Sequence, residues 1–319
     1  MVDVLLASLL SPVVLAFVLG ALAVFVKSDL EIPAPLYRAL SIYLLLAIGL
    51  KGGTALSVTP LAEVAWPVLG TLLLGILTPV TAYAVLRRVG KMDRTNAAAL
   101  AAHYGSVSAV TFIAAVAVAD FSGLTAEGFM PALVAVLEVP AIIVGLLIAY
   151  ARGERAGSWQ DAMREVVTGQ SIVLLVGGMA IGWIAGKDGM APVEPFFVNG
   201  FQGALTLFLL EMGMAAARRL RDLRSVGFFI VGFGIVMPIL HGALGVWVGG
   251  LTGLSVGGAA VLGAMVSSAS YIAAPAAVRV GLPEANPAYY LTASLGITFP
   301  FNLTLGIPLY LALAQMLGA

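Results

Sequence analysis

Long apolar runs, separated by short polar segments, dominate this chain of 319 residues. A helix needs about 20 mostly apolar residues to cross a hydrocarbon core of about 30 Å. Ten runs reach this length, and they predict membrane-spanning helices at residues 4–26, 39–58, 64–86, 97–119, 129–151, 166–186, 198–217, 225–250, 256–278 and 288–317. We therefore predict an all-α polytopic membrane protein. The first run lacks the basic start and cleavage site of a signal peptide, so we expect it to be a retained span.

The second half of the chain is a diverged copy of the first half. GILTP at 75–79 returns as GIVMP at 234–238, and further matches recur at offsets of 159 to 162: Gly53 with Gly213, Pro140 with Pro300, and Ser106-x-Ser108 with Ser268-x-Ser270. Five predicted spans in each half mean that the second copy is inserted upside down. Inverted repeats are typical of secondary transporters, whose substrate site lies where the copies meet. We expect repeats at 1–151 and 166–319, joined by a short cytoplasmic linker at 152–165.

Charge is scarce and unevenly placed along the chain. Hydrophobic residues make up 61% and charged residues 10%, whereas a soluble domain carries about 25% charged residues. A formal net charge of zero argues against nucleic-acid binding, and the lack of cysteine excludes disulfides and thiolate metal sites. All but two of the 16 Lys and Arg residues fall on odd-numbered connections. The positive-inside rule places those connections in the cytoplasm and both termini outside.

Two clusters of small hydroxyl residues occupy equivalent positions in the fourth and ninth spans. The fourth reads HYGSVSAVTF at 103–112, and the ninth reads MVSSASYIAAP at 265–275. We predict that both spans break, at 104–108 and 266–270, so that two helix N-termini face one central point. Each carries about half a positive charge, and the pair would suit a small monovalent anion. The predicted anion site comprises Gly105, Ser106, Ser108, Ser267, Ser268 and Ser270. The alternative is ordinary close packing of small residues between helices.

Glu138 lies near the middle of the fifth span, two residues before Pro140. A carboxylate at this depth costs about 2.5–3.5 kcal/mol on the insertion scale, so a function is the default hypothesis. We favour cation coordination over a buried protonated acid. The predicted sodium site comprises Ser108, Thr111, Glu138, Ser270, Thr298 and Asn302. We expect no organic cofactor and no metal other than Na⁺.

Four further ionisable residues within the spans have more than one interpretation. Lys51 and Glu211 are equivalent in the two halves, but inverted symmetry places them toward opposite membrane faces, so they need not meet. A structural or snorkelling role competes with a gating role for this pair. His103 and His241 could relay protons, or could be packed and hydrogen-bonded in the protein interior.

The segments HYGSVSAVTF and SSASYIAAP resemble those of the SbtA-type sodium-dependent bicarbonate transporter family, and the likeness covers essentially the whole chain. It implies sodium-dependent symport of bicarbonate across a bacterial inner membrane, by an elevator mechanism, in a homotrimer. It also implies a gate or scaffold domain of spans 1, 2, 6 and 7 and a mobile core of spans 3–5 and 8–10. The matching serines 106, 108, 268 and 270 would surround the anion. A PII-like regulator docks on cyanobacterial members, from which this chain departs in its short central loop.

Other functions stay open at this stage. The wider broken-helix superfamily includes bile-acid and carboxylate symporters, so a Na⁺- or H⁺-coupled symporter of another small anion is the main alternative. A channel would also fit two inverted halves. An intramembrane serine protease could use Ser106 or Ser108 with His241, but hydrolysis does not need a duplicated ten-span architecture.

Overall fold

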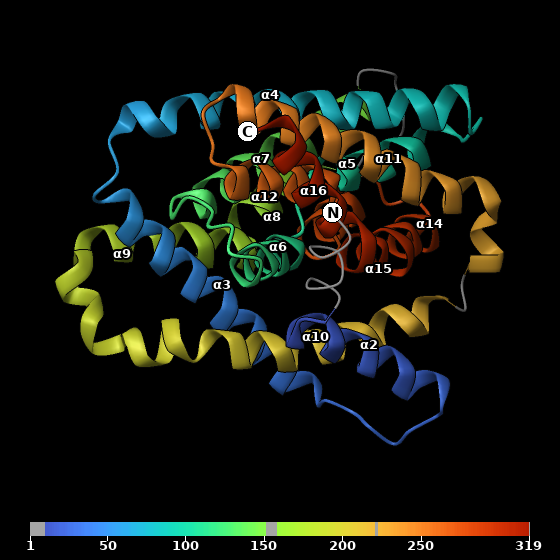
Figure 1. Ribbon diagram of the computed structural model, residues 1–319. Coiled ribbons are helices and arrows are strands. Elements are labelled where there is room, and N and C mark those ends of the chain that lie inside the picture. The colour runs from blue at the N-terminus through green and yellow to red at the C-terminus, as the bar shows by residue number, and fades with distance from the viewer. Residues whose placement is uncertain (1–9, 151–157, 221–222, 319) are drawn as a thin grey trace.

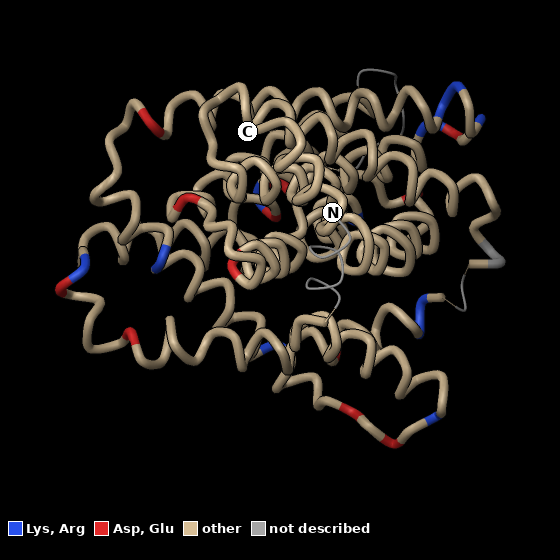
Figure 2. Tube along the Cα trace, in the orientation of Figure 1, with Lys and Arg blue, Asp and Glu red and all other residues tan. Residues whose placement is uncertain are grey.

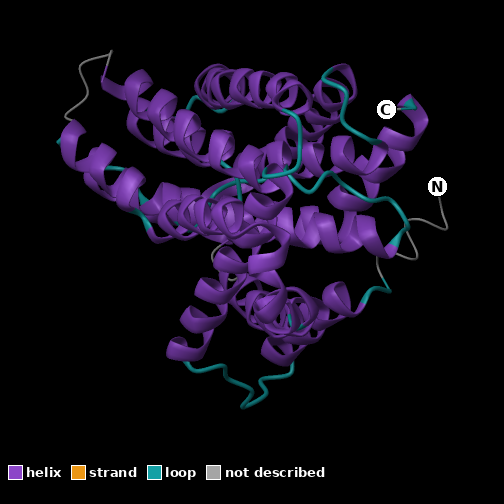
Figure 3. Ribbon diagram, turned by 90° about the vertical axis from the view of Figure 1, so that its left-hand side faces the viewer, coloured by secondary structure: helices purple, strands orange, loops and turns teal. Residues whose placement is uncertain are grey.

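The computed structural model describes residues 10–150, 158–220 and 223–318, which form helices joined by short loops and contain no strand (Figures 1 and 3). Within these ranges, eight helical segments are long and apolar enough to cross a membrane. Two shorter apolar helices, Pro12–Phe25 and Val256–Ser267, lie in the first and ninth predicted spans. An all-α polytopic membrane protein is thus confirmed, while the count of ten spans stays a prediction.

The helices follow the predicted order. The first half forms α2 (Pro12–Phe25), α3 (Ala34–Leu56), α4 (Leu61–Arg88), α5 (Arg94–Gly105), α6 (Ala109–Phe121) and α7 (Met130–Tyr150). The second half begins with α8 (Trp159–Thr168), α9 (Gln170–Met190), η1 (Ala191–Val193), η2 (Pro195–Asn199), α10 (Phe201–Arg219) and α11 (Leu223–Leu251). It continues with α12 (Val256–Ser267), α13 (Ala273–Gly281), α14 (Pro287–Leu291), η4 (Thr292–Thr298), α15 (Phe299–Phe301), η5 (Asn302–Gly306) and α16 (Ile307–Leu317).

The sixth span begins later than predicted. Residues 159–168, which the sequence divided between the linker and this span, form the separate helix α8. Ser158 caps α8 by accepting the Asp161 N–H (3.2 Å), and Gly169 then adopts an extended conformation that ends it. The transmembrane helix α9 therefore starts at Gln170 rather than at residue 166. The remainder of the predicted linker at 152–157 lies outside the described residues.

The helices form two packed groups. In the first, α2 packs on α10 and α3 packs on α9, and these helices lie along the lower side of the molecule in Figure 1. In the second, α4 packs with α5 and α7, while α11 packs with α12 and α16. Figure 1 shows α4 and α11 along the upper side, with α5, α6 and α12 beneath them.

Glycines bring the helices of the first group into backbone contact. A Cβ atom at Gly20 in α2 would overlap the Leu210 carbonyl of α10, and one at Gly182 in α9 would overlap the Leu50 carbonyl of α3. The same holds for two further pairs: Gly53 against Met179, and Gly213 against Phe17. Small residues permit this close approach where lipid provides no hydrophobic drive for helix association. Every one of these contacts joins a helix of the first half to a helix of the second half.

The charged residues gather toward the ends of the long helices. Figure 2 shows long uncharged stretches along the helices, with many of the coloured residues at the left-hand and right-hand ends of the molecule. Apolar side chains on these stretches are exposed, for example Trp66, Leu73, Trp183 and Ile184. Such exposure would be unfavourable in water but suits a lipid environment. The distribution supports helices that lie across the membrane with their ends in water.

We predict that Gly53→Ala lowers the melting temperature of the purified protein in detergent. The added methyl group would collide with the Met179 backbone, and overpacking of this kind typically costs about 1–3 kcal/mol. Gly177→Ala on α9 is the matched control, because a Cβ at Gly177 meets no atom within 4 Å. Equal melting temperatures for the two variants would contradict the packing described for α3 and α9.

Candidate functional site

Both predicted breaks are present. The chain leaves the helix after Gly105 and re-enters it at Ala109, and it does so again between Ser267 and Ala273. Serine favours this because its hydroxyl competes with the helical ladder for local backbone groups. Ser108 accepts the Thr111 N–H (3.1 Å) at the start of α6. Ser270 likewise accepts the N–H of Ala274 (3.1 Å) in the first turn of α13.

The two breaks cross and bond to each other. The Ser108 N–H donates to the Ser268 hydroxyl (2.8 Å), and the Ser270 N–H donates to the His103 carbonyl (2.9 Å). Ser268 in turn donates its hydroxyl proton to the Met265 carbonyl (2.6 Å). Ser108 lies in the first half of the chain and Ser268 in the second, so the crossing joins one copy to the other.

A cavity of ≈ 200 Å³ lies beside the crossing. Its lining includes Ser108, Ala109, Glu138, Ser171, Ser270 and Tyr271. The first turn of any helix has N–H groups without intrahelical partners, and the start of α6 at Ala109 brings such groups to the cavity. The cavity therefore combines hydroxyl groups, a helix N-terminus and one carboxylate.

Glu138 brings a buried carboxyl group to this cavity. Its side chain is 3% exposed, and its Oε2 atom has no hydrogen-bond partner in the described part of the chain. The backbone carbonyl of Glu138 accepts the Ser106 hydroxyl (3.3 Å), which ties α7 to the first break. An unsatisfied buried oxygen lowers the stability of the fold, so we expect a cation or a proton to bind at this atom.

Asn302 and Ser267 form a separate cluster. The Asn302 amide nitrogen donates to the Ser267 carbonyl (3.1 Å), and the Ser267 hydroxyl lies 3.2 Å from the Asn302 Oδ1 atom. The Tyr310 hydroxyl is 3.3 Å from the same oxygen. These contacts occupy the Asn302 side chain, which does not line the cavity that contains Glu138.

The other predicted site residues also lie apart from that cavity. Thr298 bonds to the Tyr104 hydroxyl (2.7 Å) and to the Gly234 carbonyl (2.7 Å). Thr111 is buried, and its hydroxyl has no partner among the described residues. Gly105 allows close packing, because a Cβ there would lie 2.6 Å from the Pro79 Cδ atom. The structure thus brings together Ser108, Ser270 and Glu138 from the predicted sets.

Two polar residues of the cavity, Ser171 and Tyr271, were not predicted from the sequence. Tyr271 directly follows the second serine cluster, and its neighbour Ser270 was the available signal. Ser171 comes from α9, a helix of the other packed group, and its side chain is 5% exposed. A single serine in an apolar run carries no signal of its own, so only the packing of α9 against α7 reveals it.

Lys51 and Glu211 do not pair with each other in the structure. The Lys51 ammonium lies over the Phe201 ring, 5.5 Å from its centroid. Glu211 forms an ion pair with Arg218 (3.7 Å) at the other end of α10. The expectation that inverted symmetry separates the two residues agrees with these partners.

Both histidines are buried and packed. His103 stacks on Tyr290 with 4.4 Å between ring centroids, and its Nδ1 atom lies 2.6 Å from the Ala99 carbonyl. The His241 Nε2 atom lies 2.9 Å from the Thr81 hydroxyl. These contacts favour a structural role for the two side chains over a proton relay.

Two broken helices that cross at a polar cavity, within an all-helical membrane protein, define the class as a membrane transporter. A family model described as the Na⁺-dependent bicarbonate transporter superfamily matches residues 12–315, and the chain belongs to that superfamily. No curated protein matches the chain. Membership supports a bicarbonate transporter in a membrane, and it favours transport over catalysis.

We predict that Ser268→Ala destabilises the protein, because it leaves the buried Ser108 N–H without its acceptor. An unsatisfied buried group costs about 1–3 kcal/mol, which thermal unfolding in detergent would detect. Ser122→Ala is the control, since the Ser122 hydroxyl bonds only to the Val118 carbonyl in its own helix (2.8 Å). A Ser268→Ala melting temperature as high as that of the control would argue against the crossing bond.

Proposed function

We propose that this protein carries bicarbonate into the cell together with Na⁺, as a secondary symporter. The observation that carries the proposal is the cavity at the helix crossing. It holds a helix N-terminus and serine hydroxyls, which suit an anion, beside the unpartnered carboxyl oxygen of Glu138, which suits a cation. Family membership supports both the substrate and the sodium dependence.

The anion would bind at the two breaks. The N-termini of α6 and α13 offer partial positive charge and N–H donors, and the hydroxyls of Ser108 and Ser270 lie at the same cavity. No Lys or Arg lines that cavity. The cavity is small, which favours a small anion over a bulky organic carboxylate.

The cation would bind at Glu138. Among the described residues there is no cluster of three or more His, Asp or Glu side chains, and a single carboxylate with hydroxyl oxygens matches a monovalent ion better than Ca²⁺. The hydroxyls of Ser171 and Tyr271 are available at the same cavity. A co-bound cation would neutralise an anion that must move against an interior-negative potential. A proton on Glu138 is the alternative coupling ion.

Inverted-repeat symmetry is supported by a contact between equivalent segments. The two matching serine clusters bond to each other, through the Ser108 N–H and the Ser268 hydroxyl. Segments that contact their own counterparts lie close to the two-fold axis that relates them, so we place that axis through the crossing. The glycine contacts of α2 with α10 and of α3 with α9 repeat under the same relation.

We propose a mechanism in which one helix group moves against the other. The gate or scaffold is α2, α3, α9 and α10, and the mobile core contains α4–α7 and α11–α16. Close glycine packing within the scaffold supports a rigid frame. The core holds both breaks and Glu138, so its movement across the membrane, as in an elevator, would carry these groups past Ser171, which the scaffold contributes to the cavity.

Location and assembly follow from the charge pattern and the resemblance. The basic connections support ten spans with both termini on the outer side of a bacterial inner membrane. The resemblance implies a homotrimer in contact with lipid. A PII-like cytoplasmic regulator remains an open expectation, as does a different small anion as substrate.

The distant alternatives have less support. For a protease, Ser106 would have to act with His241, but the Ser106 hydroxyl bonds to the Glu138 carbonyl and the His241 ring bonds to Thr81. A channel would not need a coupling ion, whereas the superfamily is Na⁺-dependent. Symport therefore accounts for more of the observations than either alternative.

Uptake of labelled bicarbonate into vesicles, with and without a Na⁺ gradient, tests the function. We predict that Glu138→Gln raises the Na⁺ concentration for half-maximal uptake more than it raises the bicarbonate requirement. Glu211→Gln is the control, because Glu211 pairs with Arg218 away from the cavity. Uptake that ignores replacement of Na⁺ by K⁺ but follows a pH gradient would replace sodium coupling with proton coupling.

We predict that Ser108→Ala and Ser270→Ala each reduce bicarbonate uptake about tenfold, since hydrogen bonds to charged groups contribute about 1.5–3 kcal/mol. Expression should stay near normal. Ser294→Ala is the control, because this buried hydroxyl bonds to the Tyr290 carbonyl four residues earlier (2.6 Å), away from the cavity. Full uptake by both serine variants would remove these hydroxyls from the anion site.

A further inference from the structure

A second, larger cavity of ≈ 750 Å³ opens between the two helix groups. We call it the outer vestibule, after the side of the membrane where the proposed orientation places it. The scaffold contributes Lys51 of α3 and Phe201 and Gln202 of α10 to its wall. The core contributes α6 residues, among them Ile113 and Asp120, and the segment before α7 that contains Glu127. None of the four site serines lines it.

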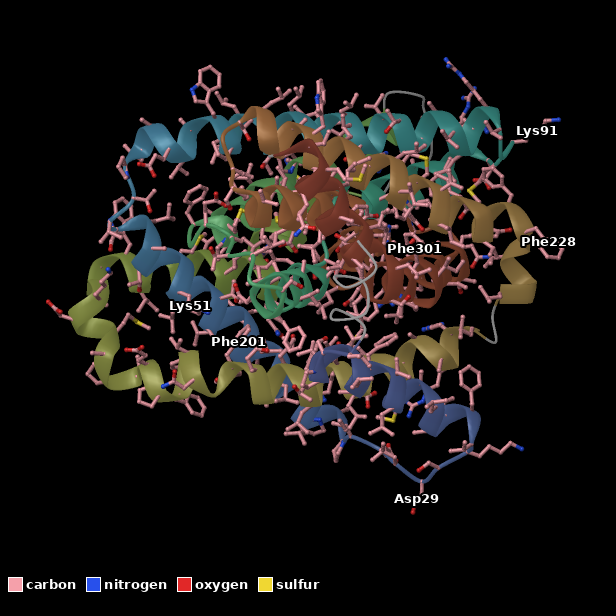
Figure 4. The ribbon with its side chains drawn as sticks, in the orientation of Figure 1. Asp29, Lys51, Lys91, Phe201, Phe228 and Phe301 are labelled. Carbon is pink, nitrogen blue, oxygen red and sulfur yellow. The ribbon has the colours of Figure 1, made fainter. Side chains whose placement is uncertain are left out.

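Lys51 presents its charged group to the outer vestibule. The ring of Phe201 holds the ammonium 5.5 Å from its centroid, within the range of about 6 Å for cation–π attraction. Figure 4 shows the two side chains next to each other, extending from α3 and α10. Lys51 makes no hydrogen bond to any residue that the structure describes, so the three N–H donors of its ammonium remain available.

Neither acidic residue of the vestibule forms a direct ion pair with Lys51 in the described part of the chain. Glu127 accepts the Ser255 N–H (2.5 Å) at the start of α12, where the helix N-terminus offsets its negative charge. Asp120 interacts electrostatically with Lys51, but across the described ranges the two side chains do not approach within the 4.0 Å of a direct ion pair. Lys51 thus keeps room for an additional anionic partner.

A third cavity lies between the vestibule and the serine cavity along α6. Ile113 lines both the vestibule and a narrow cavity of ≈ 220 Å³, and that narrow cavity shares Ala109 and Ile272 with the serine cavity. The three cavities therefore lie in series along α6, with the apolar side chains of Ile113 and Ile272 between them. Lys51 is the only basic residue among the linings of these three cavities.

We propose that Lys51 is a capture site for a small oxyanion in the outer vestibule, distinct from the serine cavity. The ammonium forms charge-assisted hydrogen bonds with the anion before it passes Ile113 and Ile272. The vestibule also contains the carboxylates of Asp120 and Glu127, so the ammonium acts by direct contact with the anion and not through a net positive field. That the captured oxyanion is bicarbonate rests on the proposed function.

The chain has no cysteine, so a single introduced cysteine reports on this site. We would place it at Gln202, which is exposed in the vestibule, and label it from outside with an anionic methanethiosulfonate reagent. The medium would be free of Na⁺ and kept at constant ionic strength with chloride. Bicarbonate is expected to slow labelling at least about threefold when Lys51 is present and to have no effect after Lys51→Gln.

Ala191→Cys provides the matched control, because Ala191 is exposed at the same end of the scaffold but does not line the vestibule. Its labelling is expected to be insensitive both to bicarbonate and to Lys51→Gln. Two results would overturn the proposal: no protection of the cysteine at 202 by bicarbonate relative to chloride, or equal protection after Lys51→Gln.

Transport provides an independent measurement. Lys51→Gln is expected to raise the KM for bicarbonate severalfold at an unchanged maximal rate, since a capture site affects association more than translocation. Lys187→Gln, which changes an outer lysine away from the vestibule, should alter neither quantity. An unchanged KM after Lys51→Gln counts against capture. If the protein shows no sodium-dependent uptake but labelling still follows Lys51, the proposed function fails and the anion site stands.

Discussion

Backbone that leaves the helical ladder inside a membrane finds no water to satisfy its polar groups, and this chain does so twice at one point. Each broken span supplies a hydrogen-bond acceptor for an N–H group of the other. The Ser108 N–H donates to Ser268, and the Ser270 N–H donates to the carbonyl of His103. Neither break has this solution alone, so the crossing requires both halves of the chain. The packing of α5, α6, α12 and α13 follows from that mutual requirement.

The groups that the crossing leaves unsatisfied are the ones that can act on a ligand. The helix N-terminus at Ala109 and the Oε2 atom of Glu138 open onto one small cavity, whereas Asn302 and Thr298 are fully engaged with protein partners. The same distinction, between polar groups that have protein partners and polar groups that face a cavity without one, applies elsewhere in the fold. Lys51 keeps free donors at a cavity, while Glu211 is paired with Arg218.

Much of the fold was predictable because it follows from the local composition of successive segments of the sequence. Lipid-length apolar runs predict helices, and serine clusters or a carboxylate within them, as at Ser108 and Glu138, stand out against that background. What depends on packing between distant segments was not predictable. Asn302 looked like a ligand, yet its amide is engaged by Ser267, because a polar residue in a span can serve a ligand or a neighbour equally well. Ser171 reached the cavity only through the docking of α9.

The glycine-packed pairs have a consequence for how the protein is made. The partner of α2 is α10, and the partner of α3 is α9, so each pair waits for a segment from the other half of the chain. Gly20 and Leu210 are separated by about 190 residues, which at about 5–20 residues per second means roughly 10–40 s of synthesis. During that time the glycine faces of α2 and α3 lack their partner helices and contact lipid or the insertion machinery. The scaffold is thus completed late, after the first half of the core has already been inserted.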